Sequence, residues 1–261
     1  MTPKALVLTG YGINCDMELA HAFKLAGADA ERVHLTDLIN GTKKLSDFHI
    51  LALPGGFSFG DDIASGKVLA NMIKYNLGEQ VGDFIDSGKL IIGICNGFQA
   101  MVKMGLLPAF DSDYTTQEVT LTFNDSGRFE DRWVHLRASA GSKCVFTKGI
   151  NSIYLPVRHG EGKFVVKNPQ VLSRLKKNNH IVFRYADRDG NLAGYPHNPN
   201  GSEDNIAGIC DETGRVFGMM PHPEAFTHRT NHPSWTREEL PEEGAGVAIF
   251  RNAVEYATER L

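Results

Sequence analysis

The chain has 261 residues, of which 42% are hydrophobic and 22% charged, and a formal net charge of −4 at pH 7. This composition is typical of a globular protein, and the chain lacks the long Lys/Arg runs of proteins that bind nucleic acid or anionic membranes. We therefore expect neither nucleic acid nor a membrane as a partner. The apolar stretch after Met1 is too short for a signal peptide or a membrane span. A cytoplasmic protein with a single domain over residues 1–261 is expected.

The first half of the chain alternates strand and helix patterns. Strands are predicted at residues 5–9, 31–35, 49–53 and 90–94, and a helix at residues 16–26, where Gly27 stops it. This alternation predicts a mainly parallel sheet that helices cover on both faces. In such open α/β sheets the ligand crevice is formed by loops at the carboxyl ends of the strands. Functional residues are therefore expected in those loops.

Between residues 117 and 166 the pattern changes to short alternating stretches, which predict antiparallel strands that extend the sheet or form a flap. These stretches include residues 118–123 and 132–137. Further strands are predicted at residues 181–185, 206–210 and 216–220, and an amphipathic helix at residues 246–258. The expected fold class is α/β: a three-layer, mainly parallel, doubly wound sheet with an antiparallel extension.

The most informative segment joins an apolar strand directly to a helix through Gly93-x-Cys95-x-Gly97. This pattern is typical of a nucleophile elbow, a tight turn that exposes the nucleophile at the sheet edge, and its flanking glycines allow close backbone approach. The following helix N-terminus favours a thiolate and offers backbone N–H groups to an oxyanion. Cys95 is therefore the candidate nucleophile. The alternative is a small buried apolar residue at a tight turn.

A cysteine nucleophile needs a base and a group that orients the base. Pro221-His222-Pro223-Glu224 follows a predicted strand, and its two prolines favour extended backbone. Residues i and i+2 of an extended segment project to the same face, so Glu224 can hold one nitrogen of His222 and leave the other facing Cys95. The alternative for His222 is a capping or solvated loop histidine.

The segment Leu53–Asp61 contains adjacent glycines, Gly55 and Gly56, directly after a predicted strand. Adjacent glycines allow backbone N–H groups to approach an oxyanion without steric cost. Together with the N–H of Asn96 they form the predicted oxyanion hole. The same residue types also occur in ordinary tight turns, so it is the position at a strand end that favours an oxyanion hole here.

The other cysteines are Cys15, Cys144 and Cys210. Cys15 also follows a strand near a helix start and is the competing nucleophile, although Asn14 or Asp16 can equally cap that helix. Cys144 and Cys210 lie in strand-like surroundings and are expected to be packing residues. No C-x-x-C pair and no zinc-type Cys/His spacing is present, so no metal site is expected and a reducing compartment is favoured.

These residues resemble the class I glutamine amidotransferases, and among them the family of glutaminase components of phosphoribosylformylglycinamidine synthase. The resemblance rests on Gly12–Asp16, Pro54–Asp62, Gly93–Gln99, His159–Gly162, Asn198–Ser202 with Ile206–Ile209, and Gly218–Glu224. It implies that Cys95 attacks the side-chain amide of glutamine and that His222, held by Glu224, protonates the departing ammonia. Water then hydrolyses the glutamyl thioester.

The resemblance also implies roles for residues around the nucleophile. Gln99 would contact the bound glutamine, as the glutamine of the Cys-x-Gly-x-Gln motif does in that class. His159 and Gly160, in the His-Gly-Glu-Gly motif, would line the same pocket. From the residues alone, His159–Gly162 and Asn198–Ser202 are equally compatible with simple turn chemistry.

The partners follow from the same resemblance. Ammonia released into water would be lost, so the chain is expected to dock on a large synthase subunit that activates formylglycinamide ribonucleotide with ATP, together with a small accessory subunit. The chain has no phosphate loop of the Gly-x-x-x-x-Gly-Lys-Ser/Thr type. No cofactor is expected in this chain, and ATP and Mg²⁺ are expected on the synthase. In that family the glutaminase is either a separate subunit or a terminal domain of one long chain; we expect the separate kind.

The segment from Ala225 to Gly246 departs from short family members because it is longer, and it resembles the corresponding region of the fused form. Our hypothesis is that it packs beside the active site or on the partner, with Trp235 as a candidate contact. The alternative is an ordinary polar surface loop.

Two other functions remain open at this level. A stand-alone cysteine hydrolase or peptidase of similar architecture would use Cys95 and His222 in the same way but would turn over without a partner. A non-catalytic binding module would use the elbow and the Pro-Gly-Gly loop only to hold a ligand, and would keep its biological activity after Cys95→Ala.

Overall fold

The computed structural model describes residues 1–261 of the chain. Its strands are β1 (Lys4–Thr9), β2 (Asp29–His34), β3 (Ile50–Leu53), β4 (Leu90–Ile94), β5 (Val119–Thr122), β6 (Glu130–Ala138), β7 (Ser152–His159), β8 (Lys163–Val166), β9 (Ile181–Ala186), β10 (Ile206–Cys210) and β11 (Val216–Met219). Nine of them form one sheet in the order β2-β1-β3-β4-β11-β10-β9-β6-β7, and β5 pairs with β8 separately.

The two halves of the large sheet differ in strand direction. The pairs from β2 through β1, β3 and β4 to β11 are all parallel. The pairs from β11 through β10, β9 and β6 to β7 are all antiparallel. The predicted parallel sheet with an antiparallel extension is confirmed. Between residues 117 and 166, β6 and β7 extend the sheet as expected, while β5 and β8 form a small separate ladder.

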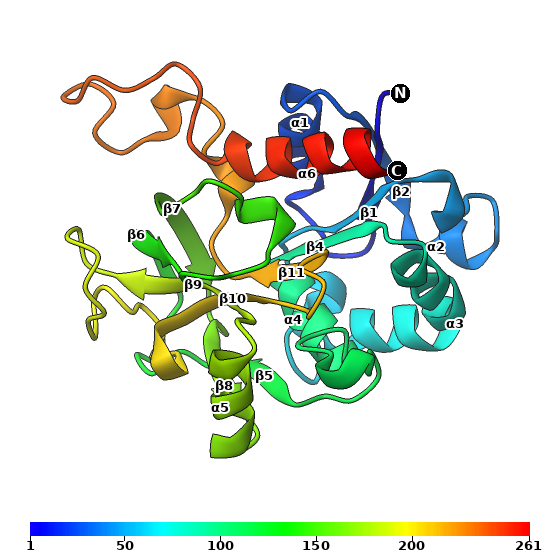
Figure 1. Ribbon diagram of the computed structural model, residues 1–261, viewed down its shortest axis with the longest axis horizontal. Coiled ribbons are helices and arrows are strands. Elements are labelled where there is room, and N and C mark those ends of the chain that lie inside the picture. Colours follow the sequence, from blue (N-terminus) through cyan, green and yellow to red (C-terminus); the bar gives the residue numbers. More distant parts are fainter.

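The helices complete a three-layer architecture. They are α1 (Asp16–Leu25), α2 (Leu35–Ile39), α3 (Lys67–Asp86), α4 (Asn96–Met104), α5 (Pro169–Lys177) and α6 (Val247–Arg260). Figure 1 shows α1 and α6 on one face of the sheet and α3 and α4 on the other. No helix of the chain combines the length and the apolar character needed to cross a membrane.

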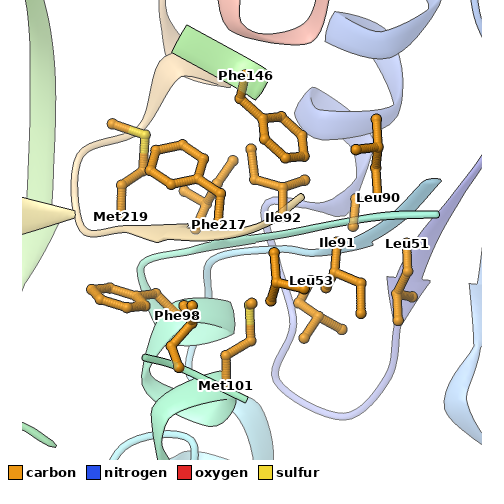
Figure 2. Packing of buried hydrophobic residues seen from close by; sticks show 14 of the residues in the cluster. Leu51, Leu53, Leu90, Ile91, Ile92, Phe98, Met101, Phe146, Phe217 and Met219 are labelled. Atoms are coloured by element: carbon orange, nitrogen blue, oxygen red, sulfur yellow. The ribbon is translucent and has the colours of Figure 1, made fainter. Parts of the chain in front are cut away.

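The core lies on both faces of the central strands. Every residue of β4 is buried, which is expected of a parallel strand between two helical layers. Figure 2 shows Ile92 on the side of Phe146 and Ile91 on the opposite side, where Phe98 and Met101 of α4 pack against the sheet. Burial of one such large side chain contributes roughly 1.5–3 kcal/mol. The elbow after β4 is thus anchored at both ends by buried elements.

The sequence patterns located the strands better than the helices. Each strand predicted from the sequence is present within two residues of its expected ends, and so are α1 and α6. The helices α2, α3 and α5 lie outside the predicted ranges. The expected single domain over residues 1–261 stays a prediction; the 70 buried hydrophobic residues that form one cluster are in keeping with it.

Candidate active site

Cys95 occupies a strained turn between β4 and α4. Its backbone has φ 50° and ψ −107°, a combination that costs a residue with a side chain about 1–3 kcal/mol and persists only where the surroundings fix it. Here the Cys95 N–H donates to the carbonyl of Met219 over 2.8 Å, and β4 and α4 are both buried. The thiol donates to the carbonyl of Arg158 at 3.6 Å. The turn has the geometry expected of a nucleophile elbow.

The two glycines of the elbow are required by close packing. A Cβ on Gly97 would collide with the carbonyl oxygen of Leu53 at the end of β3. A Cβ on Gly93 would collide with the sulfur of Met101 and stand 2.9 Å from the carbonyl of Gly97. The first turn of α4 therefore packs directly on the ends of β3 and β4, as the Gly-x-Cys-x-Gly pattern predicts.

His222 and Glu224 form a buried hydrogen-bonded pair. The Nδ1 atom of His222 lies 2.6 Å from Glu224 Oε1, and each side chain is only 2% exposed. The His222 N–H donates to the carbonyl of Pro156 over 2.9 Å. Since Pro156 belongs to β7, this strand contacts the loop that follows β11. The expected orientation of His222 by Glu224 is present.

The electrostatics of the pair favour a charged imidazole. Burial opposes the charged form, but the Glu224 carboxylate and the nearby Cys95 thiol outweigh it and raise the pKa of His222 above its ordinary value. The other polar atoms of the pair, His222 Nε2 and Glu224 Oε2, are buried without a hydrogen-bond partner. The structure thus brings Cys95, His222 and Glu224 together, and one imidazole nitrogen is left free to exchange a proton with a substrate.

Gly55 and Gly56 lie against the imidazole. A Cβ on Gly55 would stand 2.7 Å from His222 Cε1, so only glycine allows this loop to approach the ring. Gly56 has φ 148°, and its Cβ would stand 2.7 Å from the carbonyl oxygen of Gly12. The backbone N–H groups of Gly55 and Gly56 donate to no other backbone group. Their part in an oxyanion hole stays a prediction, and the free N–H groups are in keeping with it.

The side chain of Asn96 fastens this loop to α4. Its Oδ1 accepts from the N–H of Ser58 at 3.1 Å, and its Nδ2 donates to Asp61 Oδ1 and to Gln99 Oε1, each at 3.0 Å. Burial raises the pKa of Asp61. Only the N–H of Asn96 was a sequence candidate, and the fastening role of its side chain was not predicted.

Gln99 is engaged at both ends of its amide. Its Nε2 donates to the carbonyl of Glu161 over 2.6 Å, and its Oε1 accepts from Asn96. Glu161 is fixed further by Ser65, whose N–H donates to Glu161 Oε2 at 3.3 Å. The carbonyl of Ser65 in turn accepts from the Lys103 ammonium at 2.6 Å, where burial lowers the pKa of Lys103. Direct contact of Gln99 with glutamine stays a prediction; the structure shows Gln99 holding the turn between β7 and β8.

His159 begins that turn and is held by two asparagines. Its Nδ1 lies 3.1 Å from Asn124 Oδ1, and its Nε2 lies 3.4 Å from Asn200 Nδ2. Burial lowers the pKa of His159 to about 3, so the ring is neutral, with Nδ1–H donating and Nε2 accepting. Both ring nitrogens are engaged, so His159 can shape the pocket only by supporting this turn. Gly160 lies beside it in the same turn. Asn124 carried no sequence signal.

The segment Asn198–Ser202 serves the same turn. Asn200 Nδ2 also donates to the carbonyl of Gly162 at 2.8 Å, and the Ser202 hydroxyl donates to Asn200 Oδ1 at 2.7 Å. The two motifs that were compatible with simple turn chemistry are thus two halves of one hydrogen-bonded unit beside the elbow.

Cys15 lies nearer to the histidine than its sequence position indicates. Its sulfur, a ring nitrogen of His222 and a carboxylate oxygen of Glu224 all lie within 4.8 Å of one another. The absence of zinc-type spacing could not reveal this cluster, because sequence spacing detects only ligands that are close along the chain; the expectation of no metal site stays a prediction. Cys144 and Cys210 are buried packing residues, as expected, and all four cysteines are free.

The segment from Ala225 to Gly246 leads into the N-terminal end of α6 and projects beyond it, on the side of β7 (Figure 1). Its His232 is buried against the rings of Trp133, Tyr154 and Phe226, with ring centres 5.5 to 5.7 Å apart. Trp235 is 45% exposed. The first part of the segment is thus anchored on β6 and β7, and Trp235 remains open to contact.

Comparison with known proteins identifies the family. A family model described as a CobB/CobQ-like glutamine amidotransferase domain matches residues 2–257. The chain is 50% identical over 257 residues to the phosphoribosylformylglycinamidine synthase subunit PurQ of Dehalococcoides mccartyi, covering 98% of both chains. It is 48% identical over 268 residues to the subunit of the same name from Methanococcus maripaludis, again covering 98% of both.

A solved structure agrees with these relatives. The structure of PurLQS from Thermotoga maritima contains a chain that is 31% identical, with a TM-score of 0.73 and coverage of 98% of this chain and 99% of that one. The chain therefore belongs to the CobB/CobQ-like glutamine amidotransferase domains, and within them to the PurQ family of phosphoribosylformylglycinamidine synthase subunits.

Proposed function

We propose that this chain is the glutaminase subunit of phosphoribosylformylglycinamidine synthase. It hydrolyses glutamine and delivers ammonia to a synthase that converts formylglycinamide ribonucleotide, with ATP, to formylglycinamidine ribonucleotide in purine biosynthesis. The observation that carries this proposal is the buried His222–Glu224 pair beside the strained Cys95 turn, in a chain that matches PurQ subunits over nearly its full length.

In the proposed mechanism, the Cys95 thiol passes its proton to Nε2 of His222, and the sulfur attacks the side-chain carbonyl carbon of glutamine. The resulting oxyanion accepts hydrogen bonds from backbone N–H groups of Gly55, Gly56 and Asn96. His222 donates its Nε2 proton to the amide nitrogen, and the C–N bond breaks to release ammonia and leave a glutamyl thioester. The imidazole then accepts a proton from water, which attacks the thioester. Glutamate and the thiol are released, so the sum is glutamine plus water to glutamate plus ammonia.

The substrate side of the pocket is proposed from the turn between β7 and β8. Gln99 and His159 act there mainly as positioning residues, because their polar atoms already hold Glu161 and the asparagine pair. Gly160 lies next to them and, because it has no side chain, leaves its backbone open to the pocket. A substrate that binds between this turn and Gly55 lies over Cys95.

The partners are proposed from the relatives. The related structure is described as PurLQS, so we assign this chain a large synthase subunit and a small accessory subunit as partners, as separate chains. ATP and Mg²⁺ are assigned to the synthase, and no cofactor to this chain. A cytoplasmic location is part of the proposal, since the other enzymes and substrates of such a pathway must share its compartment.

The test measures glutamate released from glutamine by the purified chain and by Cys95→Ala, each alone and with the synthase subunits, ATP and formylglycinamide ribonucleotide. Cys144→Ala, at a buried cysteine far along the chain from the elbow, is the matched control. We expect release that depends on Cys95 and rises with the full mixture. Equal rates with and without partners would indicate a stand-alone hydrolase. Full biological activity of Cys95→Ala would indicate a binding module.

A further inference from the structure

Cys15 is a second thiol near the site, and it forms no bond to substrate in the proposed reaction. It precedes α1 in the chain and is half-buried. Its sulfur lies 3.3 Å from where a Cβ on Gly55 would stand, on the loop that contacts the His222 ring. The sulfur, a His222 nitrogen and a Glu224 oxygen lie within 4.8 Å of one another. Three different metal-binding groups therefore converge from two distant parts of the sequence.

The donor set matches one class of ion. Thiolate sulfur, imidazole nitrogen and carboxylate oxygen are the ligands of Zn²⁺, at bond lengths that place ligand atoms about 3.5 Å apart around a tetrahedral ion. The three ligand atoms of the cluster lie within 4.8 Å of one another, so they must draw closer together to hold such an ion. Mg²⁺ and Ca²⁺ prefer oxygen ligands throughout. The Mg²⁺ that accompanies ATP is therefore not expected to compete for this cluster.

A second observation at the same residues also points to a ligand. His222 Nε2 and Glu224 Oε2 are buried and have no hydrogen-bond partner in the chain. Buried polar atoms in native proteins are nearly always paired, and an unpaired one costs about 1–3 kcal/mol. Nε2 of His222 carries the proton that the proposed reaction transfers, whereas Oε2 of Glu224 has no role in it, and both atoms are open to an ion between turnovers. Because Cys15 is half-buried, the cluster can be reached from solvent.

We propose that Cys15, His222 and Glu224 form an inhibitory site for Zn²⁺ or another thiophilic divalent cation. On binding, the Cys15 thiol and the charged imidazole of His222 each release one proton to solvent. The Cys15 sulfur then bonds to the ion, and His222 and Glu224 supply a nitrogen and an oxygen lone pair. No electron transfer is involved. The inhibitory consequence rests on the proposed function, because the bound ion occupies the imidazole that protonates the departing ammonia. Binding of the ion itself does not depend on that function.

The binding test titrates Co²⁺, as a spectroscopic substitute for Zn²⁺, into the metal-free full chain. Wild type is expected to develop a thiolate-to-cobalt charge-transfer band that saturates at one equivalent and disappears when Zn²⁺ is added. Cys15→Ala is expected to lack the band, and the matched control Cys144→Ala to retain it. Absence of the band in wild type, or its full retention in Cys15→Ala, overturns the proposal. A band that survives Cys15→Ala but not Cys95→Ala assigns the ion to the nucleophile instead.

The inhibition test measures the Zn²⁺ concentration that halves glutamine hydrolysis. Cys15→Ala is expected to retain hydrolysis and to raise this concentration at least about tenfold, since even partners behind the metal ligands contribute about 10- to 100-fold to affinity. Mg²⁺ at millimolar concentration should not inhibit. If Cys15→Ala does not fold, Cys15→Ser, whose side chain is similar in size to that of cysteine, is used in its place. A cobalt band without glutaminase activity refutes the proposed function alone, and activity without the band refutes the metal site alone.

Discussion

The side-chain amide of Asn96 donates to Asp61 Oδ1 over 3.0 Å, which ties the residue after the nucleophile to the loop that carries Gly55 and Gly56. Through this contact the two parts of the proposed oxyanion hole share one rigid support. Neither Asn96 nor Asp61 needs to touch substrate for the link to matter, because misplacement of catalytic groups by about 1 Å costs about 10²-fold in rate.

Asn96→Asp is expected to lower kcat/KM for glutamine by about 10²-fold. The new carboxylate has the same size but faces Asp61, so attraction becomes repulsion and the loop moves away from α4. Steady-state glutamate release measures the effect. The control is Asn76→Asp, at an exposed residue of α3. Unchanged kcat/KM in a folded Asn96→Asp chain would contradict the shared support.

Glu224→Gln is expected to lower kcat at least about 10²-fold and to move the alkaline limb of its pH profile to lower pH. In the native chain, Glu224 and Cys95 overcome burial and raise the pKa of His222, so the acid form needed for ammonia release persists to higher pH. Removing the carboxylate lowers that pKa. The His222–Glu224 pair stabilises the folded chain fully below the ordinary pKa of histidine. This stabilisation is lost as the pH rises through the raised pKa of His222.

Two measurements check this expectation: kcat against pH, and an NMR titration of the His222 ring in Cys95→Ala and in Cys95→Ala with Glu224→Gln. Glu79→Gln, on the exposed face of α3, is the control. If both chains titrate His222 at the same pH, Glu224 does not set its charge.

His159→Gln is expected to make the free energy of unfolding less sensitive to acid. The folded chain keeps His159 neutral down to a pKa of about 3, while the unfolded chain protonates it below about 6.5. Between these values the unfolded state binds one more proton, so His159 reduces stability by about 1.4 kcal/mol for each unit that the pH falls. The variant loses that contribution. Urea unfolding at pH 7, 6 and 5 decides the matter, and parallel pH dependences of variant and wild type would contradict it.

Gly97→Ala and Gly82→Ala are expected to change stability in opposite directions. The Cβ on Gly97 collides with the carbonyl of Leu53, whereas a Cβ on Gly82 in α3 has no atom within 4 Å. Overpacking of this kind typically costs about 1–3 kcal/mol, while Gly→Ala in a helix gains roughly 0.5–1 kcal/mol. Thermal or urea unfolding of both variants measures the contrast. Equal stability of the two variants would show that α4 can move away from β3.

Trp235→Ala is expected to weaken binding of the chain to its synthase partner by about tenfold, the loss typical of an exposed aromatic anchor. Trp235 is 45% exposed and is carried by a segment anchored through His232. The control is Tyr75→Ala, at an 80% exposed aromatic residue on α3. Affinity is measured by titration of labelled chain with the synthase subunits. Deletion of residues 231–242 without loss of binding or ammonia transfer would make the segment an ordinary surface loop.

The sequence by itself determined the parts of the site whose geometry is local. The Cys95 turn requires two glycines and a strand and helix that adjoin it, and His222 and Glu224 are two residues apart, so residue spacing and backbone preference are enough to place them. All strands except β7 and β8 were located for the same reason, because side chains that alternate or run continuously apolar record which faces are buried. The long helix α3 was not predicted, although its buried residues repeat at helical spacing.

Only the tertiary structure decided which distant residues meet. Three sets of contacts join remote segments: those of Pro156 and Arg158 of β7 with the site, the support of His159 by Asn124 and Asn200, and the approach of Cys15 to His222. Such contacts are set by the order of strands and the packing of layers, which leave no periodic trace in the residues that make them. For this reason the sequence alone selected Cys95 and His222 as the predicted nucleophile and base, whereas their supports, and the thiol beside them, became visible only when the chain was folded.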